Sequence, residues 1–124
     1  MKKVLIADSD ETLKDTFRLV FPKEEYEILY AKNGKEALEL AYKERPCIFI
    51  VNVYLSDMKG QEVLNAIRDK GEIGDYRFYF LREKGVEEDL TDSGIDGIID
   101  KPINYLAVHQ LILEGAFESG FPTD

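Results

Sequence analysis

The chain has 124 residues, of which 25 are acidic and 16 are basic, so it carries a formal charge of −9. Apolar residues make up 44% of the sequence, which is enough to build one hydrophobic core in a chain of this length. Direct binding to nucleic acid or to an anionic membrane depends on clustered lysine and arginine, so neither is expected here.

The sequence offers little material for disulfides, zinc sites or export. Cys47 is the only cysteine and His109 the only histidine, which excludes an intramolecular disulfide and a Cys/His zinc site. Both lie within apolar patterns and are expected to be packing residues. The apolar run at residues 4–7 is too short for a secretion signal, so a cytoplasmic protein is expected.

Strand patterns and helix patterns alternate along the whole chain. Continuous apolar runs predict buried strands at residues 4–7, 26–31, 47–51, 78–81 and 95–99. Apolar residues at helical spacing predict helices around residues 13–21, 34–45, 63–67, 86–93 and 105–116. The segment 86–93 has only Val86 and Leu90 as apolar anchors, so its helix should be short and mostly solvated.

This alternation predicts an α/β fold, a three-layer, doubly wound, five-stranded parallel sheet with helices on both faces. In such sheets, ligands bind at the carboxyl ends of the strands, near the point where the strand order reverses. The candidate site residues that follow the strands are Asp8, Ser9, Asp10, Asn52, Arg82, Glu83, Lys101 and Pro102. Ser9 and Asp10 also suit the start of the first helix as caps, and Asp8 is otherwise a solvated turn residue.

Short motifs along the chain share one further pattern. They are Val-Leu-Ile-Ala-Asp at 4–8, Asn-Gly-Lys-Glu-Ala-Leu at 33–38, Pro46, Gly60 with Glu62-Val63-Leu64, and Gly94-Ile95-Asp96-Gly97 before Lys101-Pro102. Their order and spacing resemble those of the bacterial response-regulator receiver domain of two-component systems. The resemblance implies a flavodoxin-like (βα)5 receiver domain over residues 1–118, with residues 119–124 as a tail.

Receivers accept a phosphoryl group on an aspartate at the end of the third strand. That aspartate and an acidic pair after the first strand hold Mg²⁺, and a lysine after the fifth strand contacts the phosphoryl group. Carried over to this chain, the resemblance places the phosphoacceptor position at Asn52, whose amide has no anionic oxygen to attack a phosphoryl donor. Of the acidic pair, Asp8 is present but Ser9 stands in the second position. Lys101 is present, and the resemblance implies a cis peptide bond between Lys101 and Pro102.

The switch residues of the family also differ. A Thr or Ser after the fourth strand normally couples to an aromatic residue on the fifth, and these positions fall on Arg82 and Ile98 here. Arg82 is either an exposed loop cation or an anion clamp together with Lys101. With Asp8 alone facing Lys101, the charges of the pocket would balance without a metal. Mg²⁺ binding should therefore be weak or absent, and Asp8 and Asn52 are the remaining candidate ligands.

The expected function is a phosphorelay signalling module that is not an enzyme and acts by phosphorylation-independent protein–protein interaction. The expected contact face comprises the fourth helix, the fifth strand and the fifth helix, with a second copy, a sensor kinase or an output protein as partner. The alternatives are phosphorylation on Asp57 or Asp10, or an engineered Asp-to-Asn change at position 52. A small-anion or nucleotide sensor is a third possibility, but the sequence has no Gly-rich phosphate loop.

Overall fold

The computed structural model describes residues 1–90 and 94–114 of the chain. Its described strands form one parallel sheet in the order β2-β1-β3-β4-β5. The strands are β1 (Lys2–Ala7), β2 (Tyr26–Ala31), β3 (Ile48–Asn52), β4 (Arg77–Arg82) and β5 (Gly97–Asp100). The helices are α1 (Leu13–Arg18), α2 (Gly34–Glu44), α3 (Gly60–Lys70) and α4 (Tyr105–His109), which continues into the π-helical turn η1 (Gln110–Glu114). The predicted doubly wound parallel sheet is confirmed.

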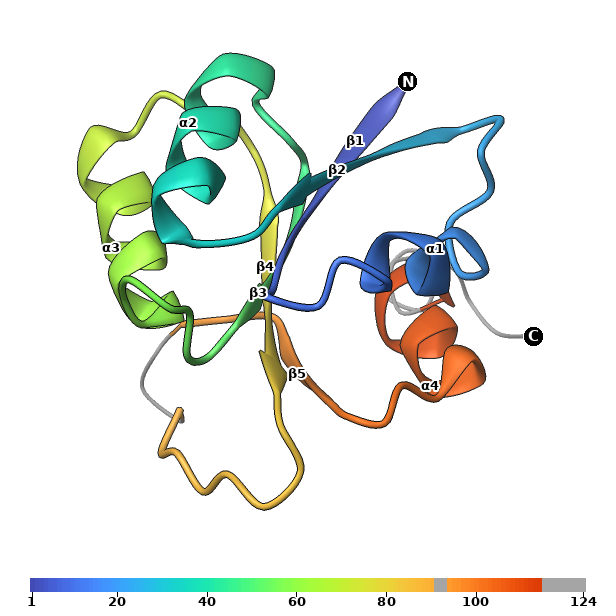
Figure 1. The fold of residues 1–124 in the computed structure, drawn as a ribbon. Helices are drawn as coiled ribbons and strands as arrows, with labels where there is room; N and C mark the ends of the chain where they lie inside the picture. Colours follow the sequence, from blue (N-terminus) through green and yellow to red (C-terminus); the bar gives the residue numbers. More distant parts are fainter. Residues whose placement is uncertain (91–93, 115–124) are drawn as a thin grey trace.

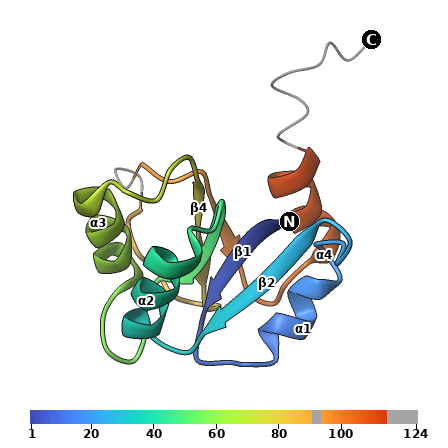
Figure 2. The same cartoon turned by 90° about the horizontal axis from the view of Figure 1, so that it is seen from above.

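The sheet separates two hydrophobic cores. Helices α2 and α3 lie on one face, and α1 and α4 lie on the other (Figures 1 and 2). Because successive side chains of a strand point to opposite faces, Val4 and Ile6 of β1 pack on the α1 and α4 side. Their neighbours Leu5 and Ala7 join the core beneath α2 and α3. The continuously apolar strands of the sequence therefore serve both faces.

The loop after β3 is fastened to the start of α2. The side chain of Asn33 accepts a hydrogen bond from the Glu36 amide at 2.9 Å. The two carboxylate oxygens of Asp57 accept from the amides of Gly34 and Lys35 at 2.8 and 2.9 Å. These contacts satisfy amides that the first helical turn leaves without partners, and they fix the loop that follows Asn52.

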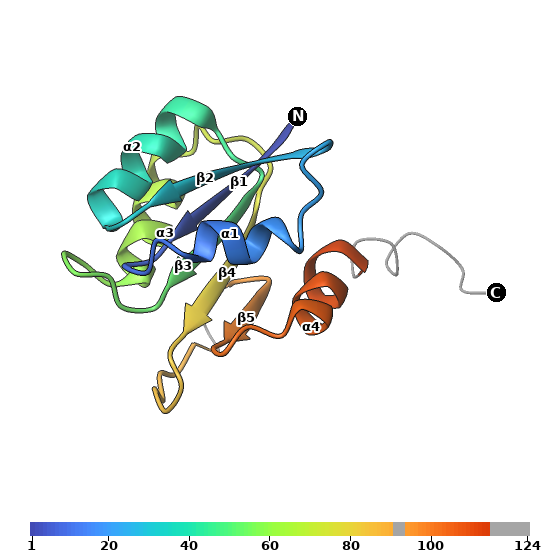
Figure 3. The same ribbon diagram turned by 45° about the vertical axis from the view of Figure 1, so that its right-hand side comes forward.

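The connection between β4 and β5 differs from the prediction. The described residues 83–90 and 94–96 contain no helix, so the helix expected at 86–93 is wrong as far as the structure describes it. The segment has too few apolar residues to bury a helical face, and Gly85 adopts a positive φ of 86°. Contacts with distant residues anchor it instead: among them, Leu90 is buried, and the Tyr54 hydroxyl donates to Glu88 at 2.5 Å. Figure 3 shows this connection extending beyond the end of β4.

The carboxyl-terminal helix follows the prediction as far as it is described, because η1 continues it to Glu114 after α4 ends at His109. Ala116 and the proposed tail at 119–124 lie outside the described residues. Cys47 packs against the core on the α1 and α4 side, as expected of a packing residue. None of the helices in the described ranges is long and apolar enough to cross a membrane.

Candidate functional site

Four polar side chains meet at the carboxyl ends of four neighbouring strands. They are Asp8, Asn52, Glu83 and Lys101, and each follows by two residues a side chain of the core on the α1 and α4 side, namely Ile6, Ile50, Leu81 and Ile99. The alternation of side chains along a strand therefore points all four to the same side of the sheet. The strand order reverses between β1 and β3, where ligands collect in this fold.

Asp8 forms the floor of this pocket, with no solvent exposure at all. Its Oδ1 atom accepts a hydrogen bond from the Asp10 amide at 2.8 Å. Its Oδ2 atom accepts from Asn52 Nδ2 at 2.7 Å and lies 3.0 Å from Lys101 Nζ. A buried carboxylate needs this kind of compensation, because an unpaired charge in the interior is strongly unfavourable.

Asn52 is buried and uses both ends of its amide group. Its Nδ2 atom donates to Asp8 Oδ2 at 2.7 Å and to Glu83 Oε2 at 2.9 Å. Its Oδ1 atom accepts from the Tyr54 amide at 2.9 Å. The N–H groups thus face two carboxylates while the oxygen faces an amide, which fixes the orientation of the side chain.

Glu83 is the candidate after the fourth strand that lies in the pocket, although the receiver pattern gives it no role. Its Oε2 atom accepts hydrogen bonds from both Lys101 Nζ, at 2.7 Å, and Asn52 Nδ2. The hydrogen bond from Lys101, and the smaller contribution from Asn52, lower the pKa of Glu83 below its ordinary value of 4.5 despite partial burial. The sequence indicates this position of Glu83, because it follows the buried Leu81 by two residues and side chains two apart on a strand point to the same face of the sheet.

Lys101 completes a closed ring of hydrogen bonds. Its peptide bond to Pro102 is cis, as expected, and its ammonium group bridges Asp8 and Glu83. Burial lowers the pKa of Lys101, but the hydrogen bonds to Glu83 and Asp8 outweigh it and raise the pKa above the ordinary 10.5. One oxygen of each carboxylate therefore accepts from both Asn52 and Lys101, so that donors and acceptors alternate around the ring.

The pocket's charge differs from the expectation. Asp8 does not face Lys101 alone, because Glu83 adds a second carboxylate, so two negative charges meet one positive charge. The pocket still fits Mg²⁺ poorly: Asp8 Oδ2 already accepts from two donors, and Asn52 directs its oxygen at the Tyr54 amide. Among the described residues, no three metal-binding side chains are grouped closely enough to hold a metal ion.

Comparison with known proteins identifies the family. The model of the response regulator receiver domain matches residues 4–113. The chain belongs to this family. It is 30% identical over 106 residues to the polar-differentiation response regulator DivK of Brucella anthropi, a match that covers 83% of this chain and 86% of the relative.

Solved receiver structures share the fold. A two-component response regulator from Clostridium difficile superposes with a TM-score of 0.79 at 19% identity, covering 98% of this chain and 100% of that one. The chemotaxis response regulator CheY4 of Vibrio cholerae gives 0.74 at 24% identity, covering 95% and 98% of the two chains. This chain is therefore a receiver domain of the two-component type, a class of signalling module that binds protein partners such as kinases and output domains.

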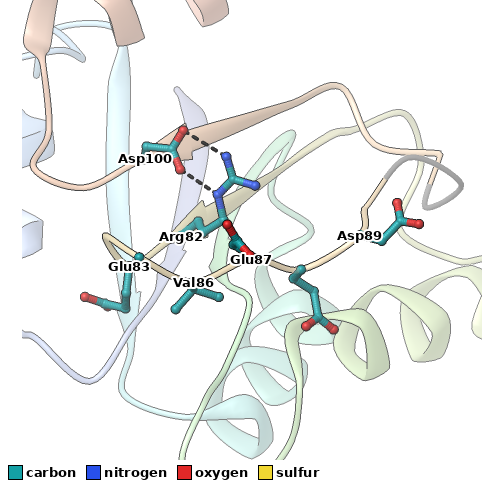
Figure 4. Close-up of a pocket in the computed structure, with 8 residues that line it drawn as sticks. Arg82, Glu83, Val86, Glu87, Asp89 and Asp100 are labelled. Atoms are coloured by element: carbon teal, nitrogen blue, oxygen red, sulfur yellow. Dashed lines mark hydrogen bonds and ion pairs between the residues drawn. The ribbon is translucent and has the colours of Figure 1, made fainter.

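The structure corrects the assignment of Arg82 to the receiver pocket. Its guanidinium group forms a two-pronged ion pair with Asp100, its register partner on β5, with Nε–Oδ1 and Nη2–Oδ2 distances of 2.6 and 3.1 Å. Figure 4 shows this pair, with the side chain of Glu83 directed away from it. Arg82 follows the buried Phe80 by two residues and so faces the opposite side from Glu83. It forms no clamp with Lys101.

The remaining candidates do not take part in the hydrogen-bonded ring of Asp8, Asn52, Glu83 and Lys101. Ser9 is exposed. Asp10 accepts hydrogen bonds from the amide and the hydroxyl of Thr12 at 3.0 and 2.6 Å, and these lower its pKa. Ile98 is partly buried on β5 opposite Phe80.

Proposed function

We propose that this receiver domain signals by phosphorylation-independent protein–protein interaction, is not an enzyme, and takes no phosphoryl group at position 52. The amide of Asn52, fully engaged with Asp8, Glu83 and Tyr54, is the observation that carries the proposal. An amide has no anionic oxygen for attack on a phosphoryl donor. Its N–H groups also donate hydrogen bonds to carboxylate oxygens that a metal would otherwise bind.

The proposal includes weak or absent Mg²⁺ binding. Mg²⁺ requires several oxygen ligands in near-octahedral geometry and gives up its water reluctantly. The ammonium group of Lys101 lies between Asp8 and Glu83, at 3.0 and 2.7 Å from their oxygens. A metal ion would have to displace it. The chain's own cation therefore takes the part that a divalent ion has in the pocket of the family.

The two other candidate acceptors have structural roles. Both carboxylate oxygens of Asp57 accept amide hydrogen bonds at the start of α2, and Asp10 accepts two hydrogen bonds from Thr12. A phosphoryl group on either would disrupt these contacts. The fit of the Asn52 amide between two carboxylates likewise favours a natural asparagine over an engineered one, because an aspartate there would face two like charges.

We place the partner-binding face on β5, α4 and the segment 83–90, because the described chain lacks the fourth helix of the original expectation. Tyr105 and Leu106 of α4 expose 47% and 65% of their surface, which supports an apolar contact here. The partner is a second copy, a sensor kinase or an output protein in the cytoplasm, and the acidic charge disfavours nucleic acid and membranes.

The phosphorylation experiment separates the alternatives. The purified chain is incubated with Mg²⁺ and either acetyl phosphate or beryllofluoride, and intact mass and amide chemical shifts are recorded. We expect no adduct and no shift of the amides near Asn52. A labile adduct that maps to Asp57 or Asp10 would overturn the proposal. The Asn52→Asp variant is the matched control, and strong phosphorylation of that variant would favour an engineered change instead.

The interaction itself is tested without a phosphodonor. A fragment of a sensor kinase from the same organism, or the unlabelled chain, is titrated into isotope-labelled protein, and amide shifts are followed. Shifts that concentrate on residues 83–90 and 97–109 support the proposed face. Binding that appears only after phosphodonor is added contradicts a phosphorylation-independent output.

A further inference from the structure

Two donors of the pocket converge on one carboxylate oxygen. Lys101 Nζ and Asn52 Nδ2 lie 2.7 and 2.9 Å from Glu83 Oε2. Asn52 is buried and held by Asp8 and Tyr54, so its amide is preorganised for the anion rather than drawn in by it. A cation and a fixed neutral donor aimed at the same point are the elements of a site for an oxyanion.

Glu83 is much more exposed to solvent than the charged residues around its carboxylate. The side chain of Glu83 is 49% exposed, whereas those of Lys101 and Asp8 are 17% and 0% exposed. Glu83 also begins the β4–β5 connection and lines an open groove of about 600 Å³ together with Arg82, Gly85, Val86, Glu87, Glu88, Asp89 and Asp100. Because about half of the side chain is exposed, its carboxylate can be removed by substitution without disturbing buried packing.

We propose that Lys101 and Asn52 form a binding site for a carboxylate or phosphate oxyanion and that Glu83 is its tethered occupant. The chain thereby supplies one of its own side-chain carboxylates to the lysine that the family reserves for a phosphoryl group. This inference rests on the proposed function, since it concerns the same pocket. It adds that the pocket is permanently occupied rather than empty.

The tether explains why a free anion would not enter the unmodified protein. A carboxylate attached to the neighbouring strand has an effective concentration in the millimolar range or above, so a dissolved anion must exceed that level to compete. Removal of the carboxylate takes one acceptor from each donor, while both keep their contact with Asp8 Oδ2. The vacated position should then accept a small oxyanion of similar geometry.

The experiment titrates sodium acetate and, separately, inorganic phosphate into the isotope-labelled full chain at constant ionic strength. The Glu83→Ala variant should bind either anion at least about tenfold more tightly than the unmodified chain, and acetate should return the Asn52 side-chain amide signals toward their original positions. Preference for acetate over phosphate, or the reverse, identifies the better oxyanion class.

Two further variants complete the test. Glu87→Ala removes the same charge from the same groove without removing an ion-pair partner of Lys101, and it should gain no affinity. Glu83→Gln keeps the size of the side chain but removes its charge, and it should show an intermediate gain. Equal gains in Glu87→Ala and Glu83→Ala, or no response of the Asn52 amide, would overturn the tethered site. These outcomes are independent of any covalent adduct, which tests the proposed function separately.

Discussion

Glu83 and Lys101 join the ends of β4 and β5 through an ion pair of 2.7 Å, and the same lysine lies 3.0 Å from the buried Asp8. Asn52 donates to both carboxylates from the opposite side. One ammonium group of the chain therefore balances one of the two carboxylate charges, and the neutral Asn52 amide hydrogen-bonds to both.

The ion pair of Glu83 predicts a dependence of stability on acid. The pKa of Glu83 is lowered in the folded state, chiefly by Lys101, so its stabilisation is complete above the ordinary value of 4.5 and is lost as the pH falls through the lowered value. Glu83→Gln should cost about 0.5 to 1 kcal/mol at pH 7, discounted for its exposure, and a smaller amount at pH 3, below the ordinary pKa of the carboxyl group. Urea denaturation at both pH values measures this, with Glu87→Gln as control. A cost of the same size at both pH values contradicts it.

Removal of the lysine should have a larger effect. Lys101→Met keeps an apolar stem but leaves the fully buried Asp8 without its cation, which typically costs about 3 to 5 kcal/mol. The raised pKa of Lys101 also implies that its contribution holds below pH 10.5 and is lost as the pH rises through the higher folded-state value. Thermal or urea denaturation at pH 7 checks the first point, with exposed Lys84→Met as the matched control. A loss below about 1 kcal/mol would show that Asp8 is satisfied without it.

An aspartate at position 52 should destabilise the metal-free protein. Its carboxylate would lie where Nδ2 now donates to oxygens at 2.7 and 2.9 Å, and the pocket would hold three carboxylates against one ammonium group. We expect Asn52→Asp to lose about 1 to 3 kcal/mol without Mg²⁺ and to recover part of it with Mg²⁺. Denaturation midpoints with and without the ion give both values. An unchanged midpoint in metal-free buffer argues against the like-charge account.

Arg82 should contribute little to the pocket. Its ion pair with Asp100 is partly exposed, so a double-mutant cycle of Arg82→Ala and Asp100→Ala should give a coupling of about 1 kcal/mol or less. Neither substitution should alter the amide shifts of Asp8 or the side-chain amide of Asn52. A change at those groups in Arg82→Ala would return Arg82 to the pocket.

The sheet could be predicted because its strands are continuously apolar, as strands buried on both faces must be. Leu5 and Ile6 are neighbours on one strand and pack into the two different cores. The sequence also predicted Asp8, Asn52 and Lys101 as site residues, because they directly follow such strands. Arg82 was placed in the pocket because the receiver pattern puts its switch position there, but the side chain pairs with Asp100 instead. Because Leu81 is buried and side chains alternate along a strand, Glu83 points into the pocket and Arg82 points to the other face.

The β4–β5 connection shows what local patterns could not supply. Residues 86–90 form no helix, and the burial of Leu90 and the Glu88–Tyr54 hydrogen bond hold them against the rest of the chain. Tyr54 lies in the loop after β3, more than thirty residues away in sequence. A contact of that separation follows only from the assembled sheet.

The central claim is that Lys101 and Asn52 take up the carboxylates that would otherwise bind a divalent ion. Isothermal titration of the unmodified chain with Mg²⁺ tests this most directly, with Asn52→Asp titrated in parallel. We predict no binding in the sub-millimolar range for the unmodified chain and measurable binding for the variant. Sub-millimolar affinity in the unmodified chain would contradict the claim.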